Sequence, residues 1–453
     1  MGRAHLRRLH PAGAARRPLL PADRAAVPAD LRRAGPVRGR RGPLGAVSAT
    51  VAAHAPRTTA QEDTARLLDG ETHRSGDPYA LWAGLREREP VLWHGPGEFP
   101  GFWSLTRYDE IDEVLRDART YSSASGILLR PRAQGDDPGG NRTLALSEPE
   151  RHRVLRGAVA GWFAPRNLRL LSDALDAQAE RIVRDAVAAG RTDFVTGIAA
   201  VLPVEVVCTF LGIPERDRPD IVEWTTDAFC AGTATERTLA HLQILDYFGD
   251  LVERRRADPG DDLVSVLAAV HLDGRPLPVE DVVLNCDNLL VGGTENVRLA
   301  MSGGMLALLE RPEQWELLRG GFEEVAGTAI EEILRWTSSA THLVRRAARD
   351  AVLGGRRVRE GDLVVCWLPS ANRDPAHFAD PDAFDIRRTP NRHLALGAGP
   401  HYCVGSQLAK LEIRAVLREF VRQVRGVEQD GPPERLDSIV VGGLRTLPLR
   451  LTG

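Results

Sequence analysis

The sequence predicts a mainly α-helical fold with a small β region. Apolar residues follow a helical period over most of the chain after Thr59. Short stretches such as residues 102–106 alternate apolar and polar side chains, which predicts a few strands. The stretch between Pro278 and Pro312 predicts a helix of roughly 30 residues, about 45 Å long, which is enough to cross a whole domain. We therefore expect one helical domain arranged around this central helix.

Residues 1–58 differ from the rest because they are rich in Arg, Ala and Pro and carry no sustained period, which predicts disorder. The segment is Arg-rich like a transit peptide but lacks an apolar core or an amphipathic helix, and an RNA-binding arm is the weaker alternative. We expect translation to start near Val47 or Val51. Residues 1–58 would then be a disordered or mis-assigned extension, and residues 59–453 the single domain.

Composition argues against several classes of protein. The net charge of -3 at pH 7 argues against a nucleic-acid partner. The five cysteines are scattered without a C-x-x-C pair, so we expect no disulfide framework. We therefore expect the protein in a reducing compartment, the cytoplasm. No run of about 18 apolar residues is present, so we expect no membrane anchor.

The segment before the central helix mixes helices, strands and one long loop. Residues 79–85 predict an amphipathic helix that ends before Pro90, and residues 109–116 return to helix after the first strands. Residues 121–141 carry Gly, Pro and Asp without a period and predict a long loop. Loops of this length in compact domains are often functional.

A helix that begins after Pro149 carries His152 and Arg156 four residues apart, so both side chains leave the same face. Two cationic groups in this arrangement could clamp a carboxylate. An isolated pair of this kind is more often part of a solvated helix face, and these residues alone do not decide between the two interpretations.

The middle of the central helix holds residues that a helix normally avoids. Gly292 and Gly293 each cost on the order of 1 kcal/mol relative to Ala, so a compensating reason is expected. Either a flat ligand lies against the bare backbone, or a second helix packs closely there. Glu295 and Asn296 follow in an apolar stretch, and buried polar groups need partners.

After the central helix, Glu332 and Arg335 lie one helical turn apart and could form an ion pair worth a few tenths of a kcal/mol if exposed. Residues 352–367 predict short strands of a hairpin sheet, and residues 438–444 a turn between two strands.

The most informative segment is the loop around Cys403. It is built with Gly397, Gly399 and Gly405 and leads into a helix from Ser406. Unpaired N–H groups and the positive dipole end of a helix lower a thiol pKa, which predicts a soft anionic ligand. Such a group could be a nucleophile, a ligand of zinc or of an iron–sulfur cluster, or the axial ligand of a heme. The other cysteines lie far away, which argues against a cluster or a structural zinc.

The run from Leu396 to Gly405 resembles the heme-binding signature of cytochromes P450, Phe-Gly-x-Gly-x-His-x-Cys-x-Gly, with Leu396 in place of the usual Phe. Further similarities extend from about Asp77 to the C-terminus: the family's Glu-x-x-Arg at 332–335, its meander entry at 371–375 and its oxygen-activating helix at 292–296. The resemblance implies the cytochrome P450 fold, with heme b (iron protoporphyrin IX) between the central helix and the loop whose Cys403 is the axial iron ligand.

The resemblance also implies roles for other residues. The propionates of the heme would be held by His152 and Arg156 on one side and by Arg345 on the other, with His401 and Gly293 as further contacts. Glu332, Arg335 and Arg388 resemble a buried triad that supports the thiolate loop. The loop at 121–141, residues 336–342 and the tip of the turn at 438–444 would line the substrate pocket.

In this family an acid followed by Thr relays protons on the central helix. Glu295 keeps the acid, whereas Asn296 replaces the Thr, and an amide orients water but titrates poorly. Either Asn296 holds a water or substrate hydroxyl that completes the relay, which we favour, or proton delivery is altered. Thr294 is expected to face away.

The implied activity is that of a monooxygenase that inserts one oxygen atom from O2 into a small organic substrate, as a tailoring step in secondary metabolism such as antibiotic biosynthesis. Electrons would come from a ferredoxin and an NAD(P)H-dependent ferredoxin reductase. The substrate would be free or bound to a carrier protein, and the enzyme a monomer. Alternatives are oxidative coupling, a silent heme protein, and a peroxide-driven enzyme, although the family's peroxide users tend to carry Arg where Asn296 stands.

Overall fold

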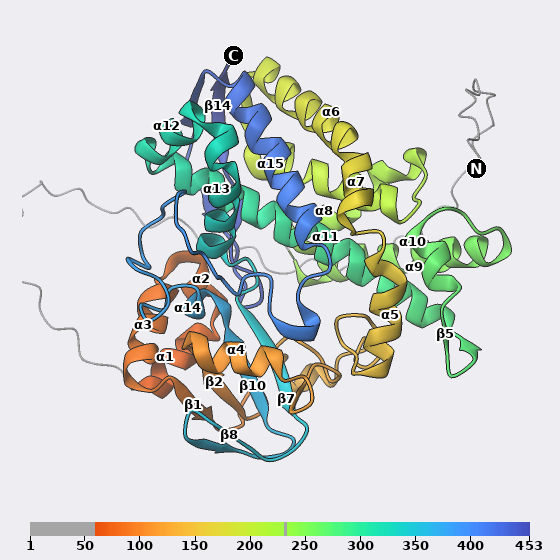
Figure 1. The fold of residues 1–453 in the computed structure, drawn as a ribbon, viewed down its shortest axis with the longest axis vertical. Coiled ribbons are helices and arrows are strands. Elements are labelled where there is room, and N and C mark those ends of the chain that lie inside the picture. The colour runs from red at the N-terminus through yellow and green to blue at the C-terminus, as the bar shows by residue number, and fades with distance from the viewer. Residues whose placement is uncertain (1–58, 231–232) are drawn as a thin grey trace, which may run out of the picture. The chain divides into compact units, whose positions relative to one another are not determined.

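The computed structural model describes residues 59–230 and 233–453. The predicted extension at residues 1–58 lies outside the described residues, so it stays a prediction. The described chain confirms the mainly α-helical fold with a small β region (Figure 1). Within it, no helix combines the length and the apolarity needed to cross a lipid bilayer.

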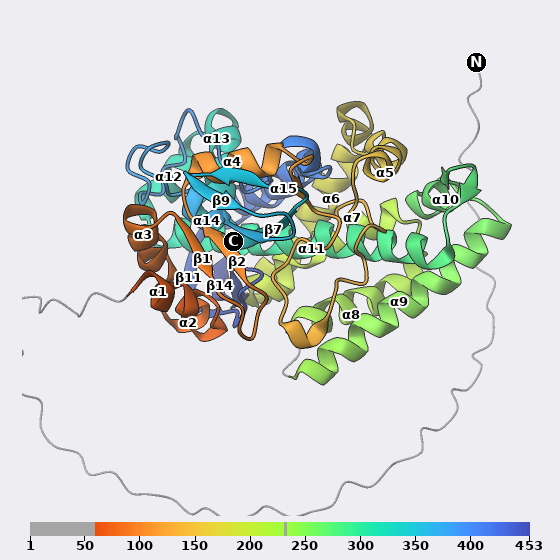
Figure 2. The ribbon, with the colours of Figure 1, turned by 90° about the horizontal axis from the view of Figure 1, so that it is seen from below.

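The central helix is α11 (Val279–Leu309), which spans 31 residues directly after Pro278. It lies amid the helical part and contacts α7 (Val201–Phe210), α9 (Ala234–Ala257), α13 (Phe322–Thr337) and α15 (Ser406–Gln423) (Figure 2). The prediction from the two flanking prolines is therefore confirmed. The remaining α-helices are α1 (Ala60–Leu67), α2 (Gly70–Ser75), α3 (Pro78–Arg88), α4 (Tyr108–Arg116), α5 (Glu150–Ala160), α6 (Pro165–Ala189), α8 (Arg218–Cys230), α10 (Leu263–Ala268), α12 (Pro312–Gly320) and α14 (Leu368–Ala371).

The largest sheet has the strand order β1-β2-β10-β7-β3. Strand β10 pairs in parallel with β2 and antiparallel with β7, so the predicted strands at 102–106 and 363–367 lie side by side. The strands of this sheet are β1 (Val91–His94), β2 (Phe102–Leu105), β3 (Tyr121–Ser122), β7 (His342–Ala347) and β10 (Leu363–Trp367).

Smaller sheets complete the β region. The predicted turn at 438–444 joins β12 (Glu434–Arg435) to β13 (Leu444–Thr446) and is confirmed. The other strands are β4 (Arg191–Asp193), β11 (Gly426–Gln429) and β14 (Pro448–Thr452) in one sheet, and the pairs β5 (His271–Leu272) with β6 (Arg275–Pro276) and β8 (Ala351–Leu353) with β9 (Arg356–Val358).

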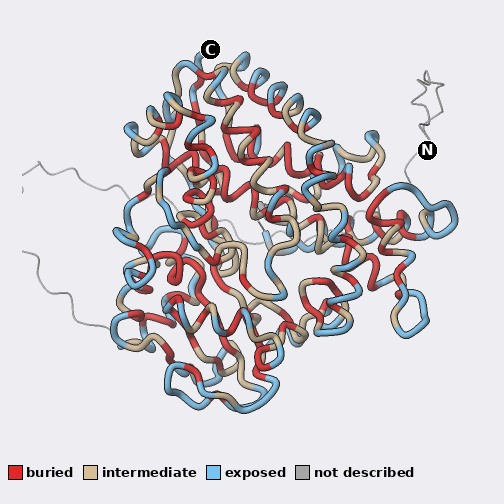
Figure 3. Tube along the Cα trace, in the orientation of Figure 1, coloured by how far each residue is buried: buried red, intermediate tan, exposed pale blue. Residues whose placement is uncertain are grey.

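Buried residues concentrate where the helices meet (Figure 3). The largest apolar cluster joins α11 to its neighbours, and two smaller clusters lie on the large sheet, where α3 contributes Trp82 and α4 contributes Ile111. Because α11 passes through the largest cluster, several helices pack against it at once.

His342, the first residue of β7, joins two segments that were predicted to line the pocket. Its Nε2 accepts the Leu129 N–H at 2.9 Å, and its Nδ1 lies 3.0 Å from the Ile439 carbonyl oxygen. Since a carbonyl oxygen only accepts, the imidazole is neutral and carries its proton on Nδ1. Burial, with a smaller contribution from His73, lowers the pKa of His342 to about 4. The side chain thus links the long loop to the C-terminal turn only while it is neutral.

We expect the free energy of unfolding to fall as the pH drops from about 6.5 to about 4, because the unfolded chain then binds a proton at His342 that the folded chain does not. Over the whole window this one side chain accounts for roughly 3 kcal/mol. Above that window both states are neutral, and the contribution does not vary with pH. Urea unfolding midpoints measured across the window test this.

The matched variant is His342→Gln, which retains a donor and an acceptor but does not titrate. Its unfolding free energy should depend less steeply on pH, while His94 and His152, whose pKa values burial also lowers to about 4, keep the remainder of the slope. A slope identical to that of the unaltered protein would contradict the prediction.

Candidate active site

Cys403 lies between the short helical turn η4 (Gly399–His401) and the start of α15 at Ser406. Its N–H donates to the Leu396 carbonyl at 3.0 Å, and the Gly405 N–H donates to its sulfur. Gly399 has φ +66°, and a Cβ at that position would come within 2.6 Å of the Leu115 carbonyl oxygen. A residue with a side chain at 399 would therefore push the loop away from α4.

The expected lowering of the Cys403 pKa does not hold for the protein alone. Burial raises the pKa of this thiol, and this effect exceeds the opposing effects of the Gly405 N–H and of the charges on Arg156 and Lys410. The correction follows from desolvation, which disfavours a buried anion more than one helix end favours it. A coordinated metal ion deprotonates a thiol outright, so its thiolate character would come from the metal.

His152, Arg156 and His401 come together beside this loop. The rings of His152 and His401 lie 4.2 Å apart between centroids, and Arg156 Nη2 donates to the Tyr402 carbonyl at 2.8 Å. His401 Nε2 lies 2.8 Å from Glu148 Oε1, a partner that the sequence did not predict. The His152 Nε2 is buried with no partner among the residues that the structure describes. This side chain thus has a free position for a further polar group.

Arg345 on β7 is a buried cation that lacks a carboxylate partner. Its side chain is 2% exposed, and its Nη1 donates to the neighbouring Val344 carbonyl at 2.9 Å. No carboxylate within residues 59–230 and 233–453 forms an ion pair with it, and burial lowers its pKa. Because an unpaired buried charge is costly, this site calls for an anionic ligand.

The two glycines of α11 have different surroundings. A Cβ on Gly292 would meet nothing within 4 Å, whereas a Cβ on Gly293 would come within 2.8 Å of Val207 Cγ2 on α7. Close helix packing therefore explains why position 293 is Gly, whereas Gly292 faces open space; the assignment of Gly293 to the cofactor stays a prediction. An open glycine face, an unpaired buried guanidinium, the orphaned His152 and a soft sulfur ligand together fit a flat iron porphyrin with two propionate groups.

In the heme-free protein, Ala at position 292 should stabilise the fold by about 1 kcal/mol, because it removes the helix penalty of Gly without meeting another group of the protein. Ala at position 293 should destabilise it by roughly 1–3 kcal/mol, because Val207 must shift. Urea unfolding of both variants tests the pair. Effects of the same sign would contradict this account of the two glycines.

Glu295 and Asn296 have partners that the sequence did not predict. The buried Glu295 carboxylate accepts from Arg298, at 2.9 Å from its Nε, and Arg298 also donates to the Leu444 carbonyl at 3.3 Å. The three-residue spacing on a helix was a usable signal for this pair. Asn296 Oδ1 accepts from Ser339 Oγ at 3.0 Å. The Glu295 carboxylate is thus held within α11, while Asn296 contacts the segment after α13.

Two other predictions about neighbouring residues agree with the geometry. Thr294 is buried and donates to the Leu290 carbonyl at 2.8 Å, so it points away from Asn296 as expected. Glu332 and Arg335 are fully buried and joined by two hydrogen bonds of 2.7 and 2.8 Å, and Arg388 lies 3.2 Å from the same carboxylate. These three residues are the predicted triad rather than a surface pair.

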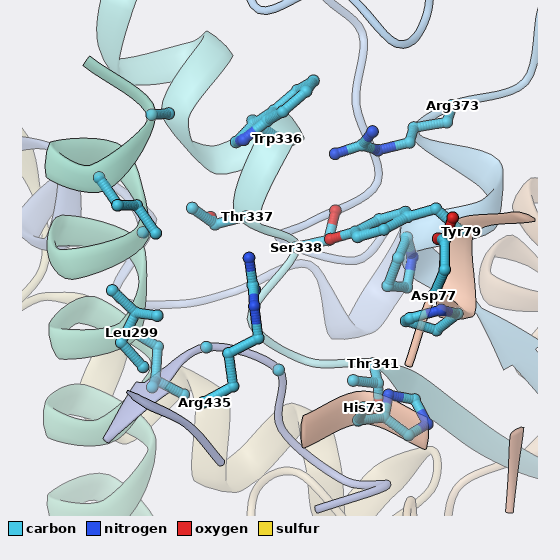
Figure 4. Close-up of a pocket in the computed structure, with 18 of the residues that line it drawn as sticks. His73, Asp77, Tyr79, Leu299, Trp336, Thr337, Ser338, Thr341, Arg373 and Arg435 are labelled. Atoms are coloured by element: carbon cyan, nitrogen blue, oxygen red, sulfur yellow. The ribbon is translucent and has the colours of Figure 1, made fainter. Parts of the chain in front are cut away.

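A cavity of about 320 Å³ begins one turn further along α11 (Figure 4). Leu299 and Ser338 lie on its wall, and Arg435 extends into it, while Arg373 is stacked between Tyr79 and Trp336 at 3.8 and 3.9 Å from the ring centroids. Cys403, Gly292 and Asn296 do not line it. The cavity is therefore separate from the site that suits the porphyrin.

Comparisons with known proteins agree on one family. A family model described as Cytochrome P450 matches residues 233–448. Cytochrome P450 NovI of Streptomyces niveus is 37% identical over 378 residues, which are 82% of this chain and 93% of the relative. The methyl-branched lipid omega-hydroxylase of Mycobacterium tuberculosis is 34% identical over 384 residues, 81% of this chain and 90% of the relative.

Solved structures give the same result. P450 OxyD, described as involved in the biosynthesis of vancomycin-type antibiotics, matches with a TM-score of 0.79 and 37% identity, covering 85% of this chain and 99% of its own. P450BioI, solved in complex with hexadec-9Z-enoic acid ligated acyl carrier protein, matches with a TM-score of 0.75 and 27% identity, covering 84% and 99%.

Proposed function

The chain belongs to the cytochrome P450 family, and we propose that this heme b monooxygenase carries out a tailoring oxidation in secondary metabolism. The observation that carries the proposal is the similarity to OxyD, at 37% identity over nearly the whole of that chain. OxyD takes part in antibiotic biosynthesis, and the two chains share the fold of the catalytic domain. The substrate would be a small organic molecule, free or tethered to a carrier protein, as the acyl chain is in the P450BioI complex.

The roles of the site residues follow from their positions. When bound, heme supplies the redox chemistry that inserts one atom of dioxygen into a substrate, and a thiolate ligand favours O–O cleavage. Cys403 would provide that thiolate, and the Gly405 N–H would stabilise it by donating to the sulfur. Arg345 would bind one propionate, and His152 with Arg156 the other. Electrons would come from a ferredoxin and its NAD(P)H-dependent reductase.

The segments around the site would determine the substrate. The long loop contributes Leu129 and the C-terminal turn contributes Ile439, both fixed by His342. Because these contacts are made by backbone groups, the side chains of the two segments are left to shape the pocket. Specificity would depend on that shape and on a few polar groups.

The test is a spectral titration of the ferric holoprotein with aromatic acids, amino acids and polyketide-like compounds, each free and tethered to a carrier protein. A shift from low to high spin followed by product carrying one added oxygen atom is the expected result. A response to tethered compounds alone would identify an assembly-line tailoring step. Turnover that yields only coupled or dehydrogenated product would contradict oxygen insertion.

Asn296 keeps a second candidate open, namely an atypical oxidation such as oxidative coupling. An amide at this position does not exchange protons as a Thr hydroxyl does, so proton delivery could differ from that of the family. The same product analysis separates this candidate from oxygen insertion, because coupling adds no oxygen atom.

A further inference from the structure

Ser339 places a hydroxyl beside the position where the family's Thr is replaced by Asn296. The Ser339 Oγ donates to Asn296 Oδ1 at 3.0 Å although the two residues are 43 positions apart. Both side chains are only partly buried. Since Asn296 lies four residues after Gly292, both leave the same face of α11, and Gly292 faces open space. The Ser339 hydroxyl therefore borders the open face of the central helix.

The backbone of Ser339 is held on its other side by the C-terminal turn. The Gly442 N–H donates to the Ser339 carbonyl at 2.8 Å, and Ala340 forms a bridge with Val441. The backbone of Ser339 is thus fixed by the C-terminal turn, and its hydroxyl is fixed by Asn296. The hydroxyl therefore stays at one place on the edge of the site, as a group that must meet a reacting atom has to do.

The other polar groups nearby are unsuited to carry a proton. The Glu295 carboxylate is paired with Arg298, and the Thr294 hydroxyl donates to the Leu290 carbonyl. The Asn296 amide has no readily exchanged proton, whereas a serine hydroxyl donates and accepts at the same time. Of these groups, Ser339 alone combines a hydroxyl with a place on the open face.

We propose that Ser339 supplies the relay hydroxyl that the central helix lacks, with Asn296 as the residue that positions it; this inference rests on the monooxygenase function. While Oγ–H donates to Asn296, the oxygen lone pairs accept a hydrogen bond from water. During transfer the Ser339 hydroxyl turns from Asn296 Oδ1 to the acceptor in the open space and passes its proton there, while Oγ takes a proton from the bound water, which in turn regains one from bulk water. Ser339 ends with one proton, as it began.

A cavity that could hold exchangeable water is lined by residues adjacent to this pair. The cavity of about 320 Å³ is lined by Leu299, one turn after Asn296, and by Ser338 and Gly442, which flank Ser339 in sequence and in space. Its volume is enough for several waters, and polar side chains such as Arg435 and Thr337 line it (Figure 4). Water held in this cavity could replace, on Ser339 Oγ, the proton that the hydroxyl has passed on.

The test compares Ser339→Ala, Ser339→Thr and the double variant Ser339→Ala/Asn296→Thr, using the compound that gives the largest spin-state shift. Ser339→Ala should lower product formed per NAD(P)H on the order of 10²-fold, with hydrogen peroxide taking up the difference. Ser339→Thr should restore coupling, and so should the double variant, which returns a hydroxyl to position 296. The ferric spectrum should stay that of the unaltered protein in all three.

Ser302→Ala is the matched control, because that hydroxyl lies on α11 but bonds only to the helix carbonyls of Arg298 and Leu299. It should leave coupling unchanged. Normal coupling in Ser339→Ala would overturn the relay, as would failure of both hydroxyl-restoring variants.

If no compound is oxygenated, the proposed function is refuted, but the inference about Ser339 can still be tested by a second measurement. The rate of peroxide formation in H2O and in D2O reports proton transfer without any product. Ser339→Ala should abolish or strongly reduce the solvent isotope effect, and Ser339→Thr should recover it. An isotope effect unaltered in Ser339→Ala would overturn the inference independently of the substrate.

Discussion

Replacing Cys403 by Ser is expected to reduce oxygenation to the level of heme-free protein while leaving the fold intact. Ser is close in size, so the bonds of the loop, such as Cys403 N–H to Leu396, should persist. Its hydroxyl is a hard, un-ionised donor that cannot supply the electron donation of a thiolate. The groups proposed to hold the propionates, Arg345 and His152 with Arg156, are untouched, so part of the heme should still bind.

The measurements are heme content, the absorption spectrum of the reduced protein with carbon monoxide, and product yield. Cys286→Ala is the control, because Cys286 is a fully buried thiol on α11 whose pKa burial raises, which keeps it protonated. This control should keep the thiolate-type spectrum. If Cys403→Ser also kept it, the ligand would have to be another residue.

Features that depend on neighbours in sequence were predictable. The ends of α11 follow from Pro278 and Pro312, and the start of α15 at Ser406 follows from the glycine-rich loop before it. The helix that carries His152 likewise begins where Pro149 predicts. Each of these depends on backbone geometry within a few residues, which local composition determines.

Features that depend on distant packing were not predictable. The pKa of Cys403 was expected to fall because the helix end is local, but the burial that raises it comes from the whole fold. Gly293 differs from Gly292 only because Val207 of another helix lies against it. Ser339 was missed as a partner of Asn296 because nothing in either segment predicts that contact.

Glu295 shows an intermediate case. Its family role was carried over from the motif, and its spacing from Arg298 already allowed an ion pair. Whether that pair forms depends on burial, since an exposed pair contributes little and a buried one holds both side chains. The structure buries both residues, to 4% and 5% exposure, so the carboxylate is committed to Arg298.

Glu332→Ala is expected to cost about 3–5 kcal/mol of unfolding free energy, because it leaves the fully buried Arg335 without its counter-charge. The carboxylate also accepts from the Asp385 N–H at 2.9 Å and from Asn391 Nδ2 at 3.0 Å, and Arg388 lies beside it. The loss is a large part of the 5–15 kcal/mol that is typical of a folded domain.

The effect should extend to the heme site, because Asn391 leads into the Cys403 loop and the Arg335 guanidinium donates to the Asn372, Pro381 and Ala383 carbonyls of the segment before it. Without Glu332, that segment and the loop lose their shared anchor. We expect heme content after expression to fall together with the urea midpoint, while the ligand residue itself is unaltered.

The neighbouring Glu331→Ala is the matched control. Glu331 is also paired, with His393 at 3.0 Å and Lys410 at 2.6 Å, but its side chain is 33% exposed. Removing Glu331 should cost less than removing Glu332, since Glu331 and Lys410 are partly exposed to water and only the His393 ring is left buried. Equal costs for the two variants would mean that burial of the Glu332–Arg335 pair does not determine the stability of this region. A third variant, Glu332→Gln, separates charge from hydrogen bonding: it keeps one acceptor oxygen for Arg335 but no counter-charge, so its cost should lie between those of the two alanine variants.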